Sequence, residues 1–506
     1  MAQQSESAAH SPQPETRRYA PTRRVAMRNV DKAWLDMDTP TNLMIINGVM
    51  LFEGVINFAR MRAIVEERLV ERYPRFRQRI VESPAGTGRL HWEDDPHFDL
   101  RSHLRHVALP APGDTETLQR FVSAIISEEL EPHRPLWRFY LIENYAGGSA
   151  VFGRLHHCIA DGIALVQVLL SLTDENANAD METPTPAKRR SPAGAGGLFG
   201  LAGSMLRTSG RLVSAVANRT LHESLQSLAN PQHLLDMAYS LGLISLTSAA
   251  IVTKLLVIPP DNDSVFKGNL GAHKRVIWSD PVPLSEVRAI GKAAGATIND
   301  VLVAAVAGAL RRYMAEHGEI VNIRAMVPVN LRSADHPPEA LGNQFALVYL
   351  TLPLEEETAQ LRLRNVKRQM DMLKQSPEPV IVYEILNIIG MFPGRLADWV
   401  TSWFSTKASA VLTNVPGPRT QLYFAGHPMQ RIMFWVPQSG RIGLGISIIS
   451  YHGEVLLGVM VDDGLVSEPE KILASFRQEI GEMARSVGLA PAVTAIAQGE
   501  GPDATP

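Results

Sequence analysis

Residues 149–170 constrain the fold of this chain more than any other stretch of similar length. An apolar, β-prone run at 149–155 leads into the sequence HHCIADG at 156–162, and a second apolar run follows at 163–170. The first run predicts a buried strand and the second a buried helix. The H-H-x-x-x-D-G motif is therefore expected on a strand-to-helix turn.

The two histidines are the first candidates for chemistry, because an imidazole is well suited to remove a proton from an alcohol near neutral pH. If the strand continues through the pair, His156 and His157 point to opposite faces, and only one can face a given cleft. The same divergence argues against a metal site, which needs convergent ligands, and we predict none. It also argues against Cys158 as a nucleophile with His157 as its base. A structural reading stays open, in which hydrogen-bonded histidines end a strand and Asp161-Gly162 is an ordinary turn.

The length of 506 residues favours two domains over one compact core. The polar N-terminus predicts a disordered tail and not a signal peptide, because no apolar segment follows its paired arginines. We expect a tail at 1–24, an N-terminal domain at 25–175, a linker rich in Pro and Gly at 176–200, a helical connection at 201–262, a C-terminal domain at 263–490 and a second disordered tail at 491–506.

Hydrophobic periodicity places strands and helices in both predicted domains. In the N-terminal domain we expect strands at 43–52, 137–145 and 149–155, and helices at 58–69 and 118–126. The second half begins near 274–278, and in it we expect helices at 284–294, 298–317 and 468–487, and strands at 323–328, 345–352, 410–413, 429–435, 444–449 and 455–461.

The run 241–258 is the most membrane-like part of the chain, but it is too polar for a convincing span of ~20 apolar residues. Two readings stay open: a helix on a lipid surface, helped by basic residues nearby, and a buried core helix. The formal net charge of -3 gives no indication of nucleic-acid binding. Cys158 is the only cysteine, so no intramolecular disulfide can form, which is compatible with a reducing cytoplasm.

Three further features bear on function. Thr297 and Asp300 have the spacing of a helix capping box, whereas Asn299 between them is less well explained by capping. Free N–H groups at a helix start suit a forming oxyanion, so Asn299 is a candidate for that role. The segment 342–345 is a polar cluster at a predicted strand end. The chain contains no G-x-S-x-G elbow, which disfavours a serine hydrolase, and no Gly-rich phosphate loop.

Taken together, these motifs resemble the bacterial wax ester synthase/diacylglycerol acyltransferase family, a branch of the coenzyme A-dependent acyltransferases. The resemblance spans roughly residues 28–487 and keeps the family's order of motifs. The residues that carry it are Pro135, Leu136 and Trp137, the motif from His156 to Gly162, the Leu270 to Trp278 run, Asn299 and Asp300, the NVPGP turn at 414–418, and the SYxG sequence at 450–453.

The resemblance implies an α/β fold of two chloramphenicol-acetyltransferase-like domains, with mixed sheets flanked by helices and an active-site tunnel between them. Acyl-CoA is expected to enter from one side, and diacylglycerol or a long-chain alcohol from the other. His157 is implied as the general base for direct attack of the hydroxyl on the thioester, without an acyl-enzyme. No cofactor is expected beyond acyl-CoA as co-substrate.

The resemblance also assigns roles to neighbouring residues. His156 is secondary in catalysis, Asp161 holds the turn by pairing with an arginine, and Asn299 binds the thioester oxyanion. Gly162 leaves room for the pantetheine arm. The predicted substrate-binding residues are Gly162, Pro135, Leu136, Trp137 and Asp300.

Two other functions are compatible with the motif. One is a condensation-domain-like or polyketide-associated acyltransferase, whose donor is bound to a carrier protein. The other is a non-enzymatic lipid-inclusion binding protein that kept the fold, although the intact motif speaks against it. We expect a cytoplasmic protein, with peripheral association at the inner membrane or lipid inclusions as an open question.

Overall fold

The computed structural model describes residues 19, 22–83, 89–178, 254–255, 257–331, 341–389, 402–438 and 440–490. Most of the predicted N-terminal tail, the C-terminal tail and most of the predicted linker and helical connection lie outside these residues. The candidate lipid-surface helix at 241–258 also lies outside them up to Thr253.

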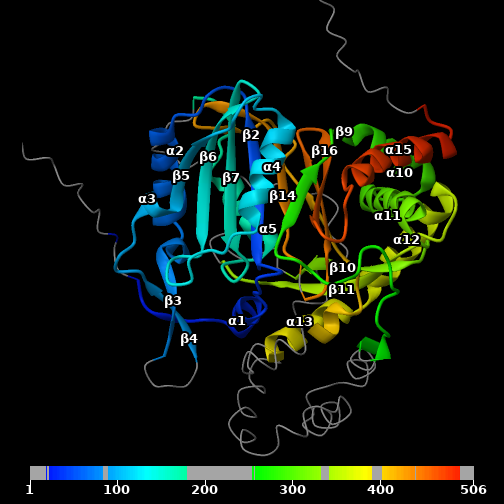
Figure 1. Ribbon diagram of the computed structural model, residues 1–506, viewed down its shortest axis with the longest axis horizontal. Coiled ribbons are helices and arrows are strands. Elements are labelled where there is room, and N and C mark those ends of the chain that lie inside the picture. Colours follow the sequence, from blue (N-terminus) through cyan, green and yellow to red (C-terminus); the bar gives the residue numbers. More distant parts are fainter. Residues whose placement is uncertain are drawn as a thin grey trace, which may run out of the picture.

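Two large mixed sheets dominate the fold (Figure 1). The first has the order β13 (Tyr423–Phe424), β14 (His427–Trp435), β2 (Ile45–Phe52), β7 (Gly148–His156), β6 (Trp137–Tyr145) and β5 (Leu104–Ala108). The second has the order β11 (Phe345–Leu352), β10 (Ile323–Asn330), β12 (Ala410–Pro416), β15 (Leu444–Tyr451), β16 (Glu454–Asp462) and β8 (Lys274–Trp278), with β9 (Val282–Pro283) also paired to β16. A small sheet joins β1 (Val25–Ala26), β4 (Leu90–Asp94) and β3 (Gln78–Glu82).

Helices flank both sheets (Figure 1). In the first half they are α1 (Asn29–Asp36), α2 (Phe58–Val65), which continues into a π-helix at Glu66–Glu71, a 3₁₀ turn at Pro74–Arg77, α3 (Leu100–His103), α4 (Thr115–Ile126) and α5 (Gly162–Ser171). In the second half they are α10 (Leu284–Ala294), α11 (Ile298–His317), α12 (Ala359–Gln375), α13 (Glu378–Ile389) and α15 (Glu470–Ser486).

Most of the predicted elements are confirmed, and α10, α11 and β11 have the expected bounds. The helices α1, α12 and α13 were not predicted. In α12 the apolar stripe is narrow, because an arginine at 362 replaces an apolar residue on the buried face. Tertiary packing, and not a strong periodic pattern, decides that this segment is helical.

Strand β14 ties the two halves of the chain together. It belongs to the predicted C-terminal domain by sequence, yet it pairs antiparallel with β2 and so extends the first sheet. Its buried residues Met433, Phe434 and Trp435 join the core of the first sheet. A strand from the second half of the chain is therefore part of the first sheet, which links the two halves of the chain.

The second core is centred on α11. Every residue of α11 from Val301 to Leu310 is buried, and the helix packs against α10, α12 and α15. Within the described residues, no single helix is both long and apolar enough to cross a membrane. Helices α10 and α11 meet the two criteria only together, as a pair bent by 100°.

Candidate active site

The H-H-x-x-x-D-G motif forms the predicted strand-to-helix turn, with one difference. Strand β7 ends at His156, so the alternation of side chains does not extend to His157, which lies in the turn. The N–H of His157 donates to the carbonyl of Met44 at 2.7 Å. Helix α5 then begins at Gly162, with Asp161 as its N-cap.

His157 lies in an aromatic cage and is 4 % exposed. Its ring stacks on Trp34 with centroids 4.2 Å apart, and the Phe345 ring lies 5.4 Å away. Burial lowers the pKa of His157 to about 4, so the ring is neutral at pH 7. Its buried Nδ1 has no hydrogen-bond partner. A neutral imidazole with an unused nitrogen is in the protonation state that a general base needs.

His156 has different surroundings. Its Nδ1 accepts a hydrogen bond from the backbone N–H of Cys158 at 3.1 Å, and its Nε2 lies 3.3 Å from Asp38 Oδ2. Because Nδ1 is an acceptor, we assign the ring proton to Nε2, where it faces the carboxylate. Both nitrogens of His156 are therefore used in holding the turn, and a direct catalytic role for His156 stays a prediction. Cys158 is fully buried.

Two residues just before β11 of the second sheet hold both ends of the motif turn. The Nδ2 of Asn343 donates to the carbonyl of His157 at 2.9 Å, and the N–H of Gln344 donates to Asp161 Oδ2 at 3.0 Å. Asp161 Oδ1 accepts from the N–H of Ala164 at 2.9 Å. These contacts make Asp161 a residue that fixes the turn, as expected. Its predicted arginine partner stays a prediction.

Asn343 is itself held by Asp31 on α1. Asp31 Oδ1 accepts from both the N–H and the Nδ2 of Asn343, at 3.1 and 3.0 Å. The Asp31 carboxylate is fully buried and lies 3.5 Å from Arg28 and 3.8 Å from Arg75. The Asp31–Asn343–His157 chain thus connects α1 to the backbone of the candidate base.

Sequence reasoning missed Asp31, Trp34 and Asn343 as site residues. A signal for α1 was present, since its buried residues Val30, Ala33, Trp34 and Met37 follow the i, i+3, i+4, i+7 spacing of an amphipathic helix. For Asn343 the sequence indicated only a strand end. Nothing local shows that this strand end meets a turn almost two hundred residues earlier in the chain.

Asn299 and Asp300 lie at the start of α11. Thr297 and Asp300 form both hydrogen bonds of a capping box, at 3.2 and 2.9 Å, so the described contacts of Asp300 are those of a helix cap. Asn299 Oδ1 accepts from Asn414 Nδ2 at 2.8 Å, which joins the helix start to the NVPGP turn. No described contact links Asn299 to His157. The oxyanion role of Asn299 and the substrate role of Asp300 stay predictions.

The segment 135–137 is buried, and its Trp137 pairs with Leu155 of β7, just before the motif. The Leu136 carbonyl accepts from the N–H of His156 at 3.0 Å. The Nε1 of Trp137 donates to the Phe76 carbonyl at 2.7 Å. These hydrogen bonds attach the start of β6 to the end of β7 and to the 3₁₀ turn that contains Phe76. Substrate binding by the three residues stays a prediction.

Gly162 has room for a methyl group. A Cβ atom at this position would lie 3.7 Å from Val436 and 3.9 Å from Ile46, which are ordinary contact distances. The backbone at Gly162 is helical, so its geometry does not require glycine. The path of the pantetheine arm past Gly162 stays a prediction.

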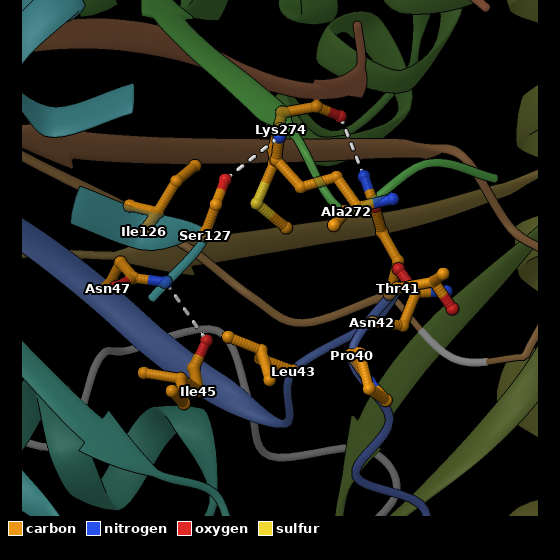
Figure 2. A pocket seen from close by; sticks show the side chains of 12 residues that line it. Pro40, Thr41, Asn42, Leu43, Ile45, Asn47, Ile126, Ser127, Ala272 and Lys274 are labelled. Atoms are coloured by element: carbon orange, nitrogen blue, oxygen red, sulfur yellow. Dashed lines mark hydrogen bonds between the residues drawn. The ribbon is translucent and has the colours of Figure 1, made fainter. Parts of the chain in front are cut away.

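The predicted tunnel between the two halves of the chain stays a prediction. A cavity of about 20 Å³ lies between them and has room for about one water molecule (Figure 2). The loop before β2 and the end of α4 line one side, and Lys274, Gln438 and Met460 line the other. His157 does not line it. The ring of His157 is covered by Trp34 of α1, and α13 packs against α1.

No group of three or more His, Cys, Asp or Glu side chains gathers as metal ligands in the described part of the chain. The site instead consists of one neutral imidazole, its aromatic cover and polar residues that fix its backbone. With two mixed sheets, and a strand from the second half of the chain built into the first of them, this arrangement is typical of the chloramphenicol-acetyltransferase-like class of acyltransferases.

Solved structures confirm the fold. The wax ester synthase/diacylglycerol acyltransferase from Marinobacter aquaeolei VT8 is similar with a TM-score of 0.63 and 20 % identity, over 92 % of this chain and 100 % of that one. The first condensation domain of the calcium-dependent antibiotic synthetase is similar with a TM-score of 0.58 and 15 % identity, over 93 % and 98 %. The fold alone therefore does not separate these two branches.

Family models separate them. The wax ester synthase/diacylglycerol acyltransferase catalytic domain matches residues 27–302, and the C-terminal domain of the same family matches 341–484. The chain belongs to the wax ester synthase/diacylglycerol acyltransferase family. Two Mycobacterium tuberculosis relatives carry the name "probable diacylglycerol O-acyltransferase": tgs2 is 27 % identical over 91 % of this chain and 98 % of its own length, and tgs1 is 25 % identical over 81 % and 84 %.

Proposed function

We propose that this acyltransferase moves a fatty acyl group from acyl-CoA to the hydroxyl of diacylglycerol or a long-chain alcohol, with His157 as the general base. The observation that carries the assignment of the base is the neutral, buried imidazole with an unpartnered nitrogen on the motif turn. The names of the curated relatives support diacylglycerol as an acceptor.

In this reaction the acceptor oxygen attacks the thioester carbonyl carbon while an imidazole nitrogen of His157 takes the hydroxyl proton. The C–S bond of the tetrahedral intermediate then breaks, and the imidazolium returns the proton to the CoA thiolate. The Asp31–Asn343 contact holds the His157 backbone in place during both steps. Because the acceptor attacks directly, the buried Cys158 has no part in the chemistry.

The direct test is an assay with purified protein, palmitoyl-CoA and either hexadecanol or dioleoylglycerol, which follows both free thiol and ester product. We expect equal amounts of thiol and ester, and both only when the acceptor is present. Thiol release without ester would indicate a hydrolase. Turnover only with an acyl-carrier-protein donor would favour the condensation-domain alternative, and binding of lipid without turnover would favour a binding protein.

The pH profile tests the state of the base. Because burial lowers the pKa of His157 to about 4, the imidazole stays neutral down to that pH, and kcat/KM should fall only as pH drops through about 4. The same shift makes the free energy of unfolding depend on pH. The part of it that comes from keeping His157 neutral is fully present above the unfolded-state pKa of ~6.5 and is lost as pH falls toward 4. An acid limb near 6.5 would contradict a buried base in the free enzyme.

Gly162→Ala tests the predicted pantetheine path. The added methyl group fits in the folded protein at ordinary contact distances, so the free energy of unfolding should change by less than about 1 kcal/mol. If pantetheine passes over this position, the KM for acyl-CoA should rise severalfold, while the KM for the acceptor stays the same. Equal KM values in wild type and variant would place the pantetheine arm elsewhere.

A further inference from the structure

Helix α12 has an outward stripe of basic and apolar residues. Leu361, Arg364, Arg368, Met372 and Gln375 follow one another at helical spacing along its exposed side. Leu361 and Met372 are 44 % and 59 % exposed, and only three other large apolar side chains in the described residues are exposed. We call these five residues the α12 stripe. A shallow groove of about 400 Å³ runs along its C-terminal part.

The charges of the α12 stripe are not balanced by acidic neighbours. In the same groove, Asp371 already pairs with Lys367 and Lys374, at 2.6 and 3.4 Å. Arg368 donates only to the amide oxygen of Asn365, at 3.3 Å. Neither Arg364 nor Arg368 has an acidic partner among the described residues. Two arginines are therefore free to bind anions.

The opposite side of α12 is fixed to the second core. Arg362 forms a buried ion pair with Glu479 of α15, and Leu363 and Val366 are buried. Gln369 also donates to the carbonyl of Thr351 on β11 at 2.9 Å. The stripe is thus a preformed surface on a rigid helix, and binding to it does not require the helix to fold.

We propose that the α12 stripe docks onto a bilayer surface that contains anionic lipid. Arginines bind phosphate groups in bidentate geometry, and exposed Leu and Met side chains insert at the boundary between headgroups and acyl chains. Cations beside an anionic membrane each strengthen binding about fivefold. The combination of two unpaired arginines with apolar residues on both sides of them fits this partner.

The position of α12 gives the docking a consequence. Helix α13 follows α12 directly and packs on α1, which carries Trp34 over His157 (Figure 1). Docking through α12 places the enzyme at the lipid phase, where diacylglycerol and long-chain alcohols are dissolved. This inference adds a partner to the proposed acyl transfer, and it can be tested without turnover.

The test is flotation of full-length protein with phosphatidylcholine vesicles that contain 30 % or no phosphatidylglycerol, in the absence of acyl-CoA. We expect wild type to bind the anionic vesicles more tightly, and the difference to shrink at high salt. Arg364→Gln with Arg368→Gln should weaken binding to anionic vesicles by about 25-fold, since two cations are removed. The matched control is Arg288→Gln with Lys292→Gln on α10, which removes two exposed cations and should leave binding within twofold.

Three results would overturn the proposal. The first is equal binding of wild type to neutral and anionic vesicles, and the second is an α12 variant that floats like wild type. The third is an α12 variant whose KM for acyl-CoA rises without a change in flotation, which would assign the stripe to the CoA phosphates. Esterification of a detergent-dispersed acceptor by the variant should equal that of wild type, which separates failure of docking from failure of the proposed function.

Discussion

His157→Ala is expected to lower kcat for ester formation by about 10²–10⁴-fold, because the variant has no base to take the acceptor proton. The KM for acyl-CoA should change little, since the proposed role of His157 is in proton transfer. His157→Gln should lose as much activity as the alanine variant, because the amide fills the space but is not basic. Ester product is measured by radiolabelled acyl transfer, and folding by circular dichroism.

The matched control for His157 is His103→Gln. His103 is also buried, also stacks on a tryptophan (Trp137, centroids 4.5 Å apart), and also has a pKa lowered to about 4 by burial. It lies on α3 and contacts Trp137 beside the motif, but it is not on the motif turn, so the variant should lose stability while kcat falls far less than in His157→Gln. If both glutamine variants lose the same activity, the effect of His157 is structural and the assignment of the base is wrong.

Asp31→Ala is expected to destabilise the protein by about 3–5 kcal/mol. The substitution removes the buried carboxylate that accepts two hydrogen bonds from Asn343 and leaves Arg75 without it. Burial already lowers the pKa of Arg75, which indicates the cost of holding that charge in the interior. Unfolding by denaturant measures the loss in free energy.

Measurements of activity separate the effect of Asp31 on stability from its effect on the His157 turn, which acts through Asn343. Because Asn343 holds the carbonyl of His157, Asn343→Ala should lower kcat more than it raises either KM. The control on the same helix is Asp36→Ala, which removes a partly buried pair with Lys32 and should cost about 1 kcal/mol, well below the loss in Asp31→Ala. If Asp31→Ala is no less stable than Asp36→Ala, the Asp31–Asn343 contact does not hold the turn.

The condensation-domain structures share the fold, so the distinction between the two branches depends on sequence and not on architecture. The family models extend over both halves of this chain. Similarity at this level of identity shows the fold alone, and the site residues decide which acceptor reaches His157.

The sequence by itself determined the strand-to-helix turn, because its apolar runs have a strong local pattern and Asp161 and Gly162 are common at helix starts. It also determined the family, because the motifs occur in a fixed order. Only the tertiary structure decided that Asn343 and Asp31 hold His157 and that Trp34 covers it. These contacts join segments far apart in the chain, and no local periodicity encodes which strand end meets which turn.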